Sequence, residues 1–182
     1  MSVIKKYFNF VIIILLLTSN YCYSDNLNIL FEKLFNAKNI QKAKQLEDEI
    51  WNNWTKHPNN DYLTNKLENG TYSMYQQQYR IALKLFTDVI NEDPKWAEGW
   101  NKRATLLFIL GDYEKSLDDI DKVLDLEPRH FGALSGRAQI YLSLKEYEKA
   151  VDDLRKAKSI YCLLYTSPSP RDATLSRMPS SA

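Results

Sequence analysis

Two runs of carboxylates on a regular spacing are the residues of this sequence best suited to chemistry. Asp118 and Asp119 stand 34 positions before Asp152 and Asp153, and Asp121 extends the first run. Paired carboxylates can act as general acid and base or bind a hard cation. Charges that recur at one spacing also occur on the solvated faces of repeated helices. We expect these carboxylates to lie on such solvated faces and to have no catalytic role.

Histidine, cysteine and glycine are too sparse for the other common kinds of active site. The two histidines, His57 and His130, lie far apart in the chain, and neither has a nucleophile at a useful spacing. Two cysteines and two histidines cannot form a structural zinc cluster or a disulfide framework. Five glycines leave no Gly-rich phosphate-binding loop. The sequence therefore predicts no catalytic residue, no metal ligand and no cofactor.

The composition indicates one compact domain or a short array of repeats. The chain has 182 residues, of which 45% are hydrophobic and 26% charged, so it can bury a core. The net charge of +1 is nearly balanced and gives no electrostatic attraction to nucleic acid. We therefore expect no nucleic-acid partner.

Residues 1–24 have the pattern of a secretory signal peptide. Lys5 and Lys6 precede eight unbroken apolar residues, and a plausible cleavage point with small flanking residues follows. Eight residues of helix span about 12 Å, whereas the hydrocarbon core of a bilayer is about 30 Å thick. We expect cleavage, with export across the inner membrane to the periplasm. Retention as an anchor and lipid attachment at Cys22 are the alternatives.

Residues 162–182 differ in kind from the rest of the chain. This segment contains five serines and three prolines and has no helical periodicity. It resembles translated adapter or vector read-through, and a native Ser/Pro-rich tail is the alternative. Without the signal and this segment, the chain from Asp25 to Tyr161 has 20 basic and 22 acidic residues, a net charge of −2, and no cysteine.

Equivalent residue types recur every 34 positions in the middle of the chain. A tyrosine, a large apolar residue and two small residues each occur three times, and a proline occurs twice. The aligned sets are Tyr79, Tyr113 and Tyr147; Phe86, Ile120 and Leu154; Ala82, Ser116 and Ala150; Gly70, Ala104 and Ala138; and Pro94 and Pro128. A period of this length predicts a stack of small supersecondary units.

Each unit is predicted to be a pair of antiparallel helices. Apolar residues at helical spacing mark one helix before Gly111-Asp112 and a second helix from Tyr113 onward. Pro94 and Pro128 stop the second helices of the first two units. The small residues allow the two helices of a pair to approach closely.

These motifs resemble the tetratricopeptide repeat, whose 34-residue pattern is W-x2-L-G-x2-Y, then A-x3-F, then P. The resemblance covers Leu63 to Tyr161 and implies an all-α fold, a short α-solenoid of stacked antiparallel helix pairs. The implied copies are residues 63–96, 97–130 and 131–161.

Several positions depart from the family pattern. Lys66 replaces a large apolar residue, and Asn69, Arg103 and Arg137 replace the usual leucine. The first copy is the most degenerate, as is common near the end of an array. The two arginines are expected to pair with carboxylates of a neighbouring helix, and an anion site is the alternative.

Residues 25–62 are predicted to form one more antiparallel helix pair. Its helices run from Leu27 to Phe35 and from Ile40 to Trp54, which brings the predicted total to eight. We expect this pair to be a degenerate repeat or an N-terminal cap that shields the first copy, with its apolar stripe in the core.

The other end of the array is predicted to be open. Native arrays close with a polar-faced helix, and none is apparent after Tyr161. Leu154 and Ala157 are therefore expected to face solvent. Such an end predicts marginal stability and self-association through the last repeat.

The resemblance implies that the first helix of each repeat lines a concave groove that binds extended peptides or partner helices. Amides, hydroxyls and apolar side chains aligned on this groove suit a peptide backbone held by hydrogen bonds, with one or two apolar anchors. The candidate groove residues are Leu67, Thr71, Met74, Tyr75, Glu98, Asn101, Thr105, Phe108, Ser135, Gln139 and Leu142. Packing between successive first helices is the alternative role for Met74, Phe108 and Leu142.

Some members of the family clamp a terminal carboxylate with basic and amide side chains, and this clamp is not expected here. The matching positions hold Leu67, Thr71, Gly132 and Gly136. The sequence thus predicts a non-catalytic periplasmic scaffold or adaptor whose partner is another protein or a peptide. The alternative is a truncated accessory part of a larger envelope complex or enzyme.

Overall fold

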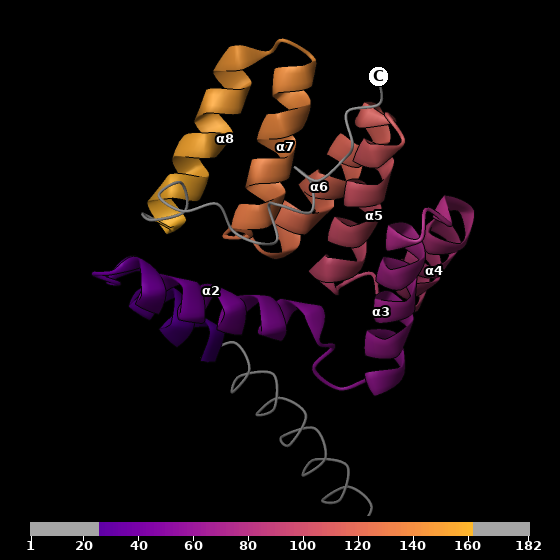
Figure 1. Ribbon diagram of the computed structural model, residues 1–182, viewed down its shortest axis with the longest axis horizontal. Coiled ribbons are helices and arrows are strands. Elements are labelled where there is room, and N and C mark those ends of the chain that lie inside the picture. Colours follow the sequence, from indigo (N-terminus) through magenta and orange to yellow (C-terminus); the bar gives the residue numbers. More distant parts are fainter. Residues whose placement is uncertain (1–25, 162–182) are drawn as a thin grey trace, which may run out of the picture.

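The computed structural model describes residues 26–161, and over that range the protein consists of eight helices without strands (Figure 1). The predicted all-α fold is therefore confirmed. The first helix covers residues 26–35. The others are α2 (Ile40–Thr55), α3 (Asp61–Tyr75), α4 (Tyr79–Glu92), α5 (Ala97–Ile109), α6 (Tyr113–Leu126), α7 (Phe131–Ser143) and α8 (Tyr147–Ile160). The predicted signal peptide and the segment 162–182 lie outside the described residues.

Three helical hairpins, α3–α4, α5–α6 and α7–α8, stack side by side in chain order (Figure 1). Each hairpin turns through one residue with a positive φ, and these residues are 34 positions apart: Gln77, Gly111 and Lys145. The next backbone N–H bonds five residues back, as in Asp112 N to Leu107 O at 2.9 Å. This is the hydrogen-bond pattern of a Schellman motif, which ends a helix with a left-handed residue. The 34-residue period of the sequence thus recurs in the backbone as a left-handed residue at the same position of each hairpin.

Glycine at the third of these turns is expected to stabilise the protein. Lys145 has a φ of 62°, a conformation that costs a residue with a Cβ about 1 kcal/mol relative to glycine. The variant Lys145→Gly should therefore raise the free energy of unfolding by up to about 1 kcal/mol in urea denaturation. In the matched control Gly111→Ala, where the native φ is 77°, stability should fall. A loss of stability in Lys145→Gly would contradict the turn geometry.

The N-terminal helix pair does not shield the first repeat, as the sequence had suggested, but packs against the third. In Figure 1, α2 runs crosswise beneath α7 and α8, at the opposite end of the molecule from α4. Its Trp54 ring lies 5.1 Å from the ring of Phe131, and Phe31 of the first helix lies 6.5 Å from the same ring. Tyr161 follows α8 and packs in the same apolar cluster. The N-terminal helix pair therefore packs on the third repeat, and the chain then runs from α2 into α3 of the first repeat.

This docking also corrects the expectation of an open C-terminal end. Ala157 is fully buried, because it belongs to the cluster formed with the N-terminal pair, and Leu154 is only half-buried. The Tyr161 hydroxyl lies 3.3 Å from a carboxylate oxygen of Glu47 in α2. The part of α8 near its C-terminus is thus covered by the chain's own first two helices.

No helix between residues 26 and 161 is both long and apolar enough to cross a membrane.

Candidate functional site

Helices α3, α5 and α7 carry the residues predicted to line a groove, and we call the exposed side of these helices the concave face after that prediction. Seven of them have half-buried or exposed side chains, and these are Thr71, Tyr75, Thr105, Phe108, Ser135, Gln139 and Leu142. Met74 and Asn101 keep less than a tenth of their surface exposed. Leu67 and Glu98 are each only 1% exposed, so their side chains cannot meet a partner. Leu67 packs in the hydrophobic core between α3 and α4, and Glu98 is a charged residue buried inside the protein.

A small pocket between α5 and α7 brings four of the predicted residues together. Its volume is about 50 Å³, close to that of a small apolar side chain. The predicted residues around it are Asn101, Thr105, Phe108 and Gln139. Its apolar floor comes from Ala104, Ile120, Ala133 and Ile140. Thr71, Met74, Tyr75, Ser135 and Leu142 do not line this pocket.

Two glycines of α7 shape this pocket in different ways. A Cβ at Gly136 would meet nothing within 4 Å, so this residue leaves open space on the concave face. A Cβ at Gly132 would lie 2.6 Å from Cη2 of Trp51, so α2 occupies the groove next to the start of α7. The groove is therefore closed at one end by the chain itself and open around Gly136.

A buried acid–base pair lies behind the closed end. The Nδ1 atom of His130 accepts the backbone N–H of Ala133 at 3.0 Å and caps α7, so the ring hydrogen is on Nε2. Nε2 faces a carboxylate oxygen of Glu98 at 3.2 Å. The His130 ring is stacked on Trp54 at a centroid distance of 4.0 Å. This pair and the stacked indole join α5, the start of α7 and α2. In the sequence, His130 stood out only as a histidine without a nucleophile at a useful spacing.

The environment of Glu98 keeps its carboxyl ionised. Complete burial on its own raises the pKa of this group, but the Lys102 ammonium, 3.1 Å away, and the contact with His130 outweigh burial. The pKa of Glu98 is therefore lower than its ordinary 4.5. Asn101 adds a hydrogen bond of 3.1 Å from its amide nitrogen to the same carboxylate.

This lowered pKa predicts acid sensitivity. A carboxylate whose pKa is depressed by folding contributes stability above its unfolded pKa, and this contribution is lost as the pH falls below about 4.5. In thermal unfolding, Glu98→Gln should be less stable than wild type at pH 7 by about 1–3 kcal/mol. The difference should narrow steadily as the pH is lowered from 4.5 to 3. A constant difference across that range would show that Glu98 is not charged in the folded protein.

The repeated carboxylates form a ladder with the repeated arginines. Arg103 donates two hydrogen bonds to Asp119 (2.7 and 2.8 Å), and Arg137 donates two to Asp153 at the same distances. Arg137 also reaches Asp121 of the preceding hairpin at 2.6 Å. Hydrogen bonding to Asp153 raises the pKa of Arg137, so it is always charged. The predicted pairing of the arginines with carboxylates is confirmed.

The same ladder corrects the expectation of solvated carboxylates. Asp119 and Asp153 are buried, whereas the side chains of Asp121 and Asp152 are exposed as expected. Both oxygens of each buried carboxylate accept a hydrogen bond from an arginine, so each carboxylate is held in an ion pair. Within residues 26–161, no group of three His, Cys, Asp or Glu is placed to hold a metal ion.

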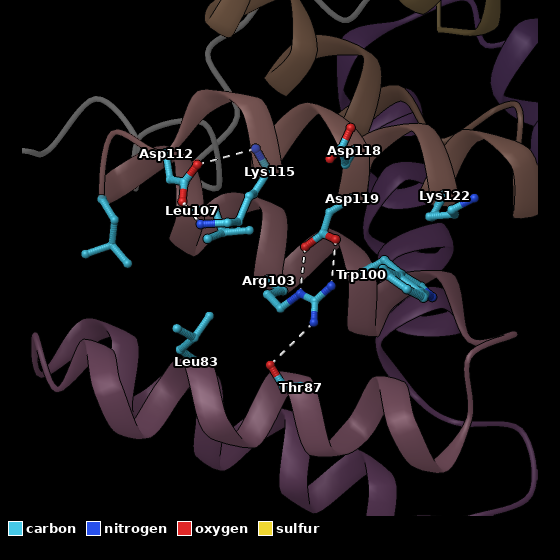
Figure 2. A pocket seen from close by; sticks show the side chains of 11 residues that line it. Leu83, Thr87, Trp100, Arg103, Leu107, Asp112, Lys115, Asp118, Asp119 and Lys122 are labelled. Carbon is cyan, nitrogen blue, oxygen red and sulfur yellow. Dashed lines mark hydrogen bonds and ion pairs between the residues drawn. The ribbon is translucent and has the colours of Figure 1, made fainter.

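A second and wider groove lies between α4 and α6, and sequence reasoning missed it. It has a volume of about 700 Å³, with α4 and α6 as walls and α5 as floor (Figure 2). Arg103 crosses the floor toward Asp119 and Thr87, and the Trp100 ring lies beside it. Thr87 and its equivalent one repeat later, Asp121, each accept a hydrogen bond from the arginine of the following repeat, Arg103 and Arg137.

Comparison with known proteins agrees with this architecture. The profile of the tetratricopeptide repeat matches residues 67–126 and 101–161. A TPR repeat-containing protein of Rhizobium etli is 35% identical over 105 residues, which cover 58% of this chain and 51% of that protein. The chain thus spans about half the length of this curated relative.

Solved structures share the fold at low sequence identity. The TPR2B domain of yeast Sti1, in a pHsp70 complex, is 22% identical with a TM-score of 0.54, and the match covers 62% of this chain and 90% of that one. The first TPR of Spaghetti (RPAP3), bound to the HSP90 peptide SRMEEVD, is 19% identical with a TM-score of 0.56 and coverages of 64% and 93%. At such identities the likeness shows the fold alone. The stacked hairpins and a profile match over more than half of the sequence place the chain in a known family: it belongs to the tetratricopeptide repeat proteins.

Proposed function

We propose that this protein is a non-catalytic periplasmic scaffold or adaptor that binds an extended peptide of a partner protein on its concave face. The observation that carries the proposal is the pocket opened by Gly136 between α5 and α7, with Asn101 and Gln139 at its edge. The amide of the half-buried Gln139 can hydrogen-bond a peptide backbone, whereas the amide nitrogen of Asn101 already bonds to Glu98, and the apolar floor suits one small apolar side chain. The Sti1 domain in its pHsp70 complex and the Spaghetti domain with its HSP90 peptide support a ligand of this class.

The chemistry of the pocket favours an uncharged peptide segment. The four predicted residues that line it, its glycines and its floor carry no charge. The position where a carboxylate clamp would need a basic side chain holds the open Gly136. A buried pocket without a counter-charge disfavours a charged side chain, because desolvation is not compensated. We therefore expect a ligand with a small apolar residue between polar, uncharged neighbours.

Selection from a phage-displayed library of random peptides tests this function. Peptides selected on the full chain should bind Gly136→Leu at least about tenfold more weakly, because the leucine fills the pocket. The matched control Val151→Leu adds one carbon on exposed α8 and should bind as wild type does. Equal affinity for both variants would reject the concave site, provided that circular dichroism shows both to be folded.

Localisation is a separate part of the proposal and needs its own test. It rests on the pattern of residues 1–24, a positive pair followed by a short apolar run. The chain produced in a Gram-negative host should appear in the osmotic-shock fraction, with a mass that shows removal of about the first 24 residues. An uncleaved chain in the cytoplasmic fraction would reject the periplasmic assignment.

A second candidate function is supported by the length of the relative from Rhizobium etli. Because this chain spans 51% of that protein, it can correspond to the accessory part of a larger envelope complex or enzyme. Sequencing the gene past codon 161 tests this idea. A catalytic domain in the continuing reading frame would favour it over the independent adaptor.

A further inference from the structure

The groove between α4 and α6 has no role in the function proposed above, although it is built around a fixed aromatic side chain. The Trp100 indole donates its N–H to the carbonyl of Pro94 at 2.9 Å, and its ring lies 5.1 Å from the Arg103 guanidinium. The half-buried Leu83 and the exposed Leu110 add apolar surface. With a volume of about 700 Å³ the groove has room for several side chains. It therefore offers a preformed aromatic and apolar surface to a ligand.

One hydrogen-bonding edge of Arg103 is poorly satisfied. Its Nε and Nη2 atoms donate to the two carboxylate oxygens of Asp119. Its Nη1 atom carries a pair of N–H groups and reaches only the hydroxyl oxygen of Thr87. That distance is 3.4 Å, beyond the roughly 2.7–3.2 Å usual for a hydrogen bond from nitrogen to oxygen. Among the residues that the structure describes, Nη1 makes no other hydrogen bond, so this edge can donate to a ligand in the groove.

The Thr87 hydroxyl is a second donor at the same place. Thr55, Thr71 and Thr105 each donate the hydroxyl to the backbone carbonyl four residues earlier, a common bond of threonines in helices. Thr87 also lies inside a helix, but within residues 26–161 it makes no such bond, and its oxygen faces Arg103 (Figure 2). The hydroxyl and Nη1 therefore lie side by side, where both can donate to one acceptor.

The next repeat shows which chemical group completes this arrangement. Arg137, 34 positions after Arg103, also binds a carboxylate of its own hairpin through Nε and Nη2, that of Asp153. Its Nη1 atom donates to the carboxylate of Asp121 in the preceding hairpin at 2.6 Å. At the same position Arg103 meets Thr87. One arginine thus holds two carboxylates in this fold, and the group that Arg103 lacks relative to Arg137 is a carboxylate.

The other charges of the groove do not oppose an incoming carboxylate. Lys115 pairs with Asp112, so these two charges cancel. Lys122 and Asp118 are exposed on α6 and carry opposite signs. Figure 2 shows the Asp118 carboxylate turned away from the Arg103 guanidinium. An anion that reaches Nη1 would therefore meet the same surroundings as the second carboxylate one repeat later.

We propose that the groove between α4 and α6 is a second binding site, which takes an acidic side chain of a partner protein. The carboxylate would accept hydrogen bonds from Arg103 Nη1 and the Thr87 hydroxyl, in the role that Asp121 has one repeat later. Apolar residues next to it in the partner would cover Trp100 and Leu110. This ligand differs in charge from the uncharged segment proposed for the concave pocket, so the two sites select different peptides.

Two capped pentapeptides that differ in one group test the site: acetyl-Gly-Leu-Glu-Leu-Gly-amide and its glutamine analogue. Amide and indole chemical shifts of the full chain report their binding. The glutamate peptide should shift the Trp100 indole N–H and bind at least about tenfold more tightly than the glutamine peptide, because a hydrogen bond between charged groups is the stronger one. Thr87→Asp supplies the carboxylate from the protein itself, as Asp121 does, and should abolish this preference. Thr87→Val removes only the hydroxyl and should weaken binding of the glutamate peptide.

Two control variants separate this site from general charge effects and from the concave pocket. Asn65→Asp adds the same charge on the exposed surface of α3, and Gly136→Leu fills the concave pocket. Both should keep the preference for glutamate, so a failure of this site is distinct from a failure of the concave site. The proposal would be overturned by equal affinity of wild type for the two peptides, or by no shift at Trp100 up to about 5 mM peptide. A preference that persists in a folded Thr87→Asp, or that is lost in either control, would also overturn it.

Discussion

Replacement of Trp54 by alanine is expected to release the N-terminal helix pair from the third repeat. The indole is 5% exposed, stacks on His130 and contacts the rings of Phe31 and Phe131. Removal of a buried tryptophan costs about 3–5 kcal/mol. The melting temperature should fall by about 10 °C or more, and trypsin should cut in the connection before α3.

Trp100 provides the matched control for this prediction. It is half-buried in the groove between α4 and α6, where its ring lies 5.1 Å from the Arg103 guanidinium. Trp100→Ala removes the same side chain from a site that does not touch the N-terminal pair. It should lower stability less and leave the connection before α3 resistant to trypsin. Equal protease sensitivity of both variants would contradict the docking of α2 on the third repeat.

Replacement of Ala104 by tryptophan is expected to unfold the repeats. Ala104 of α5 is buried where α5 meets α6, and its carbonyl accepts the Ser116 hydroxyl at 2.8 Å. The two helices approach closely because both residues are small. A tryptophan there would have to push the axes apart, and overpacking of a buried site by so many atoms exceeds the usual cost of about 1–3 kcal/mol for added methylenes. Helical circular dichroism should collapse at about 25 °C.

Val151→Trp is the control for that substitution. Val151 is 41% exposed on α8, so an indole there adds bulk without entering an interface between helices. This variant should keep a wild-type spectrum and a cooperative transition. If Ala104→Trp also melted like wild type, α5 and α6 could not be packed as described.

The hairpins could be predicted from the sequence because their signals are local. Tyr113 and Tyr147 begin α6 and α8, and the prolines at 94 and 128 follow the ends of α4 and α6, as the 34-residue period predicts. A left-handed residue closes each hairpin, and glycine occupies only the middle one. Local spacing therefore fixes each pair of helices and its stacking on the next.

The docking of the N-terminal pair could not be predicted, because an apolar stripe does not identify its partner. Trp51 and Trp54 indicate a buried face of α2, but the first and third repeats offer similar apolar ends. The choice depends on Gly132, which admits the Trp51 ring, and on His130, which stacks on Trp54. These are contacts between residues about 80 positions apart, as the difference between 51 and 132 shows.

The residues of the candidate groove could be predicted only in part, because the repeat period does not show which positions another segment covers. Alignment by period identifies which residues share a column, and three residues chosen in this way, Asn101, Thr105 and Gln139, line one pocket in the structure. It cannot distinguish an open column from one that another segment covers. Glu98 belongs to such a column and is buried with His130 beneath α2.

Amide chemical shifts of the full chain would locate a bound peptide and so decide whether the concave face is the binding site. On addition of a library-selected peptide, the largest changes are expected at Thr105, Gly136 and Gln139, around the pocket between α5 and α7. Changes centred instead on Leu83, Trp100 and Lys122 would place the ligand in the groove between α4 and α6 and contradict a concave binding site.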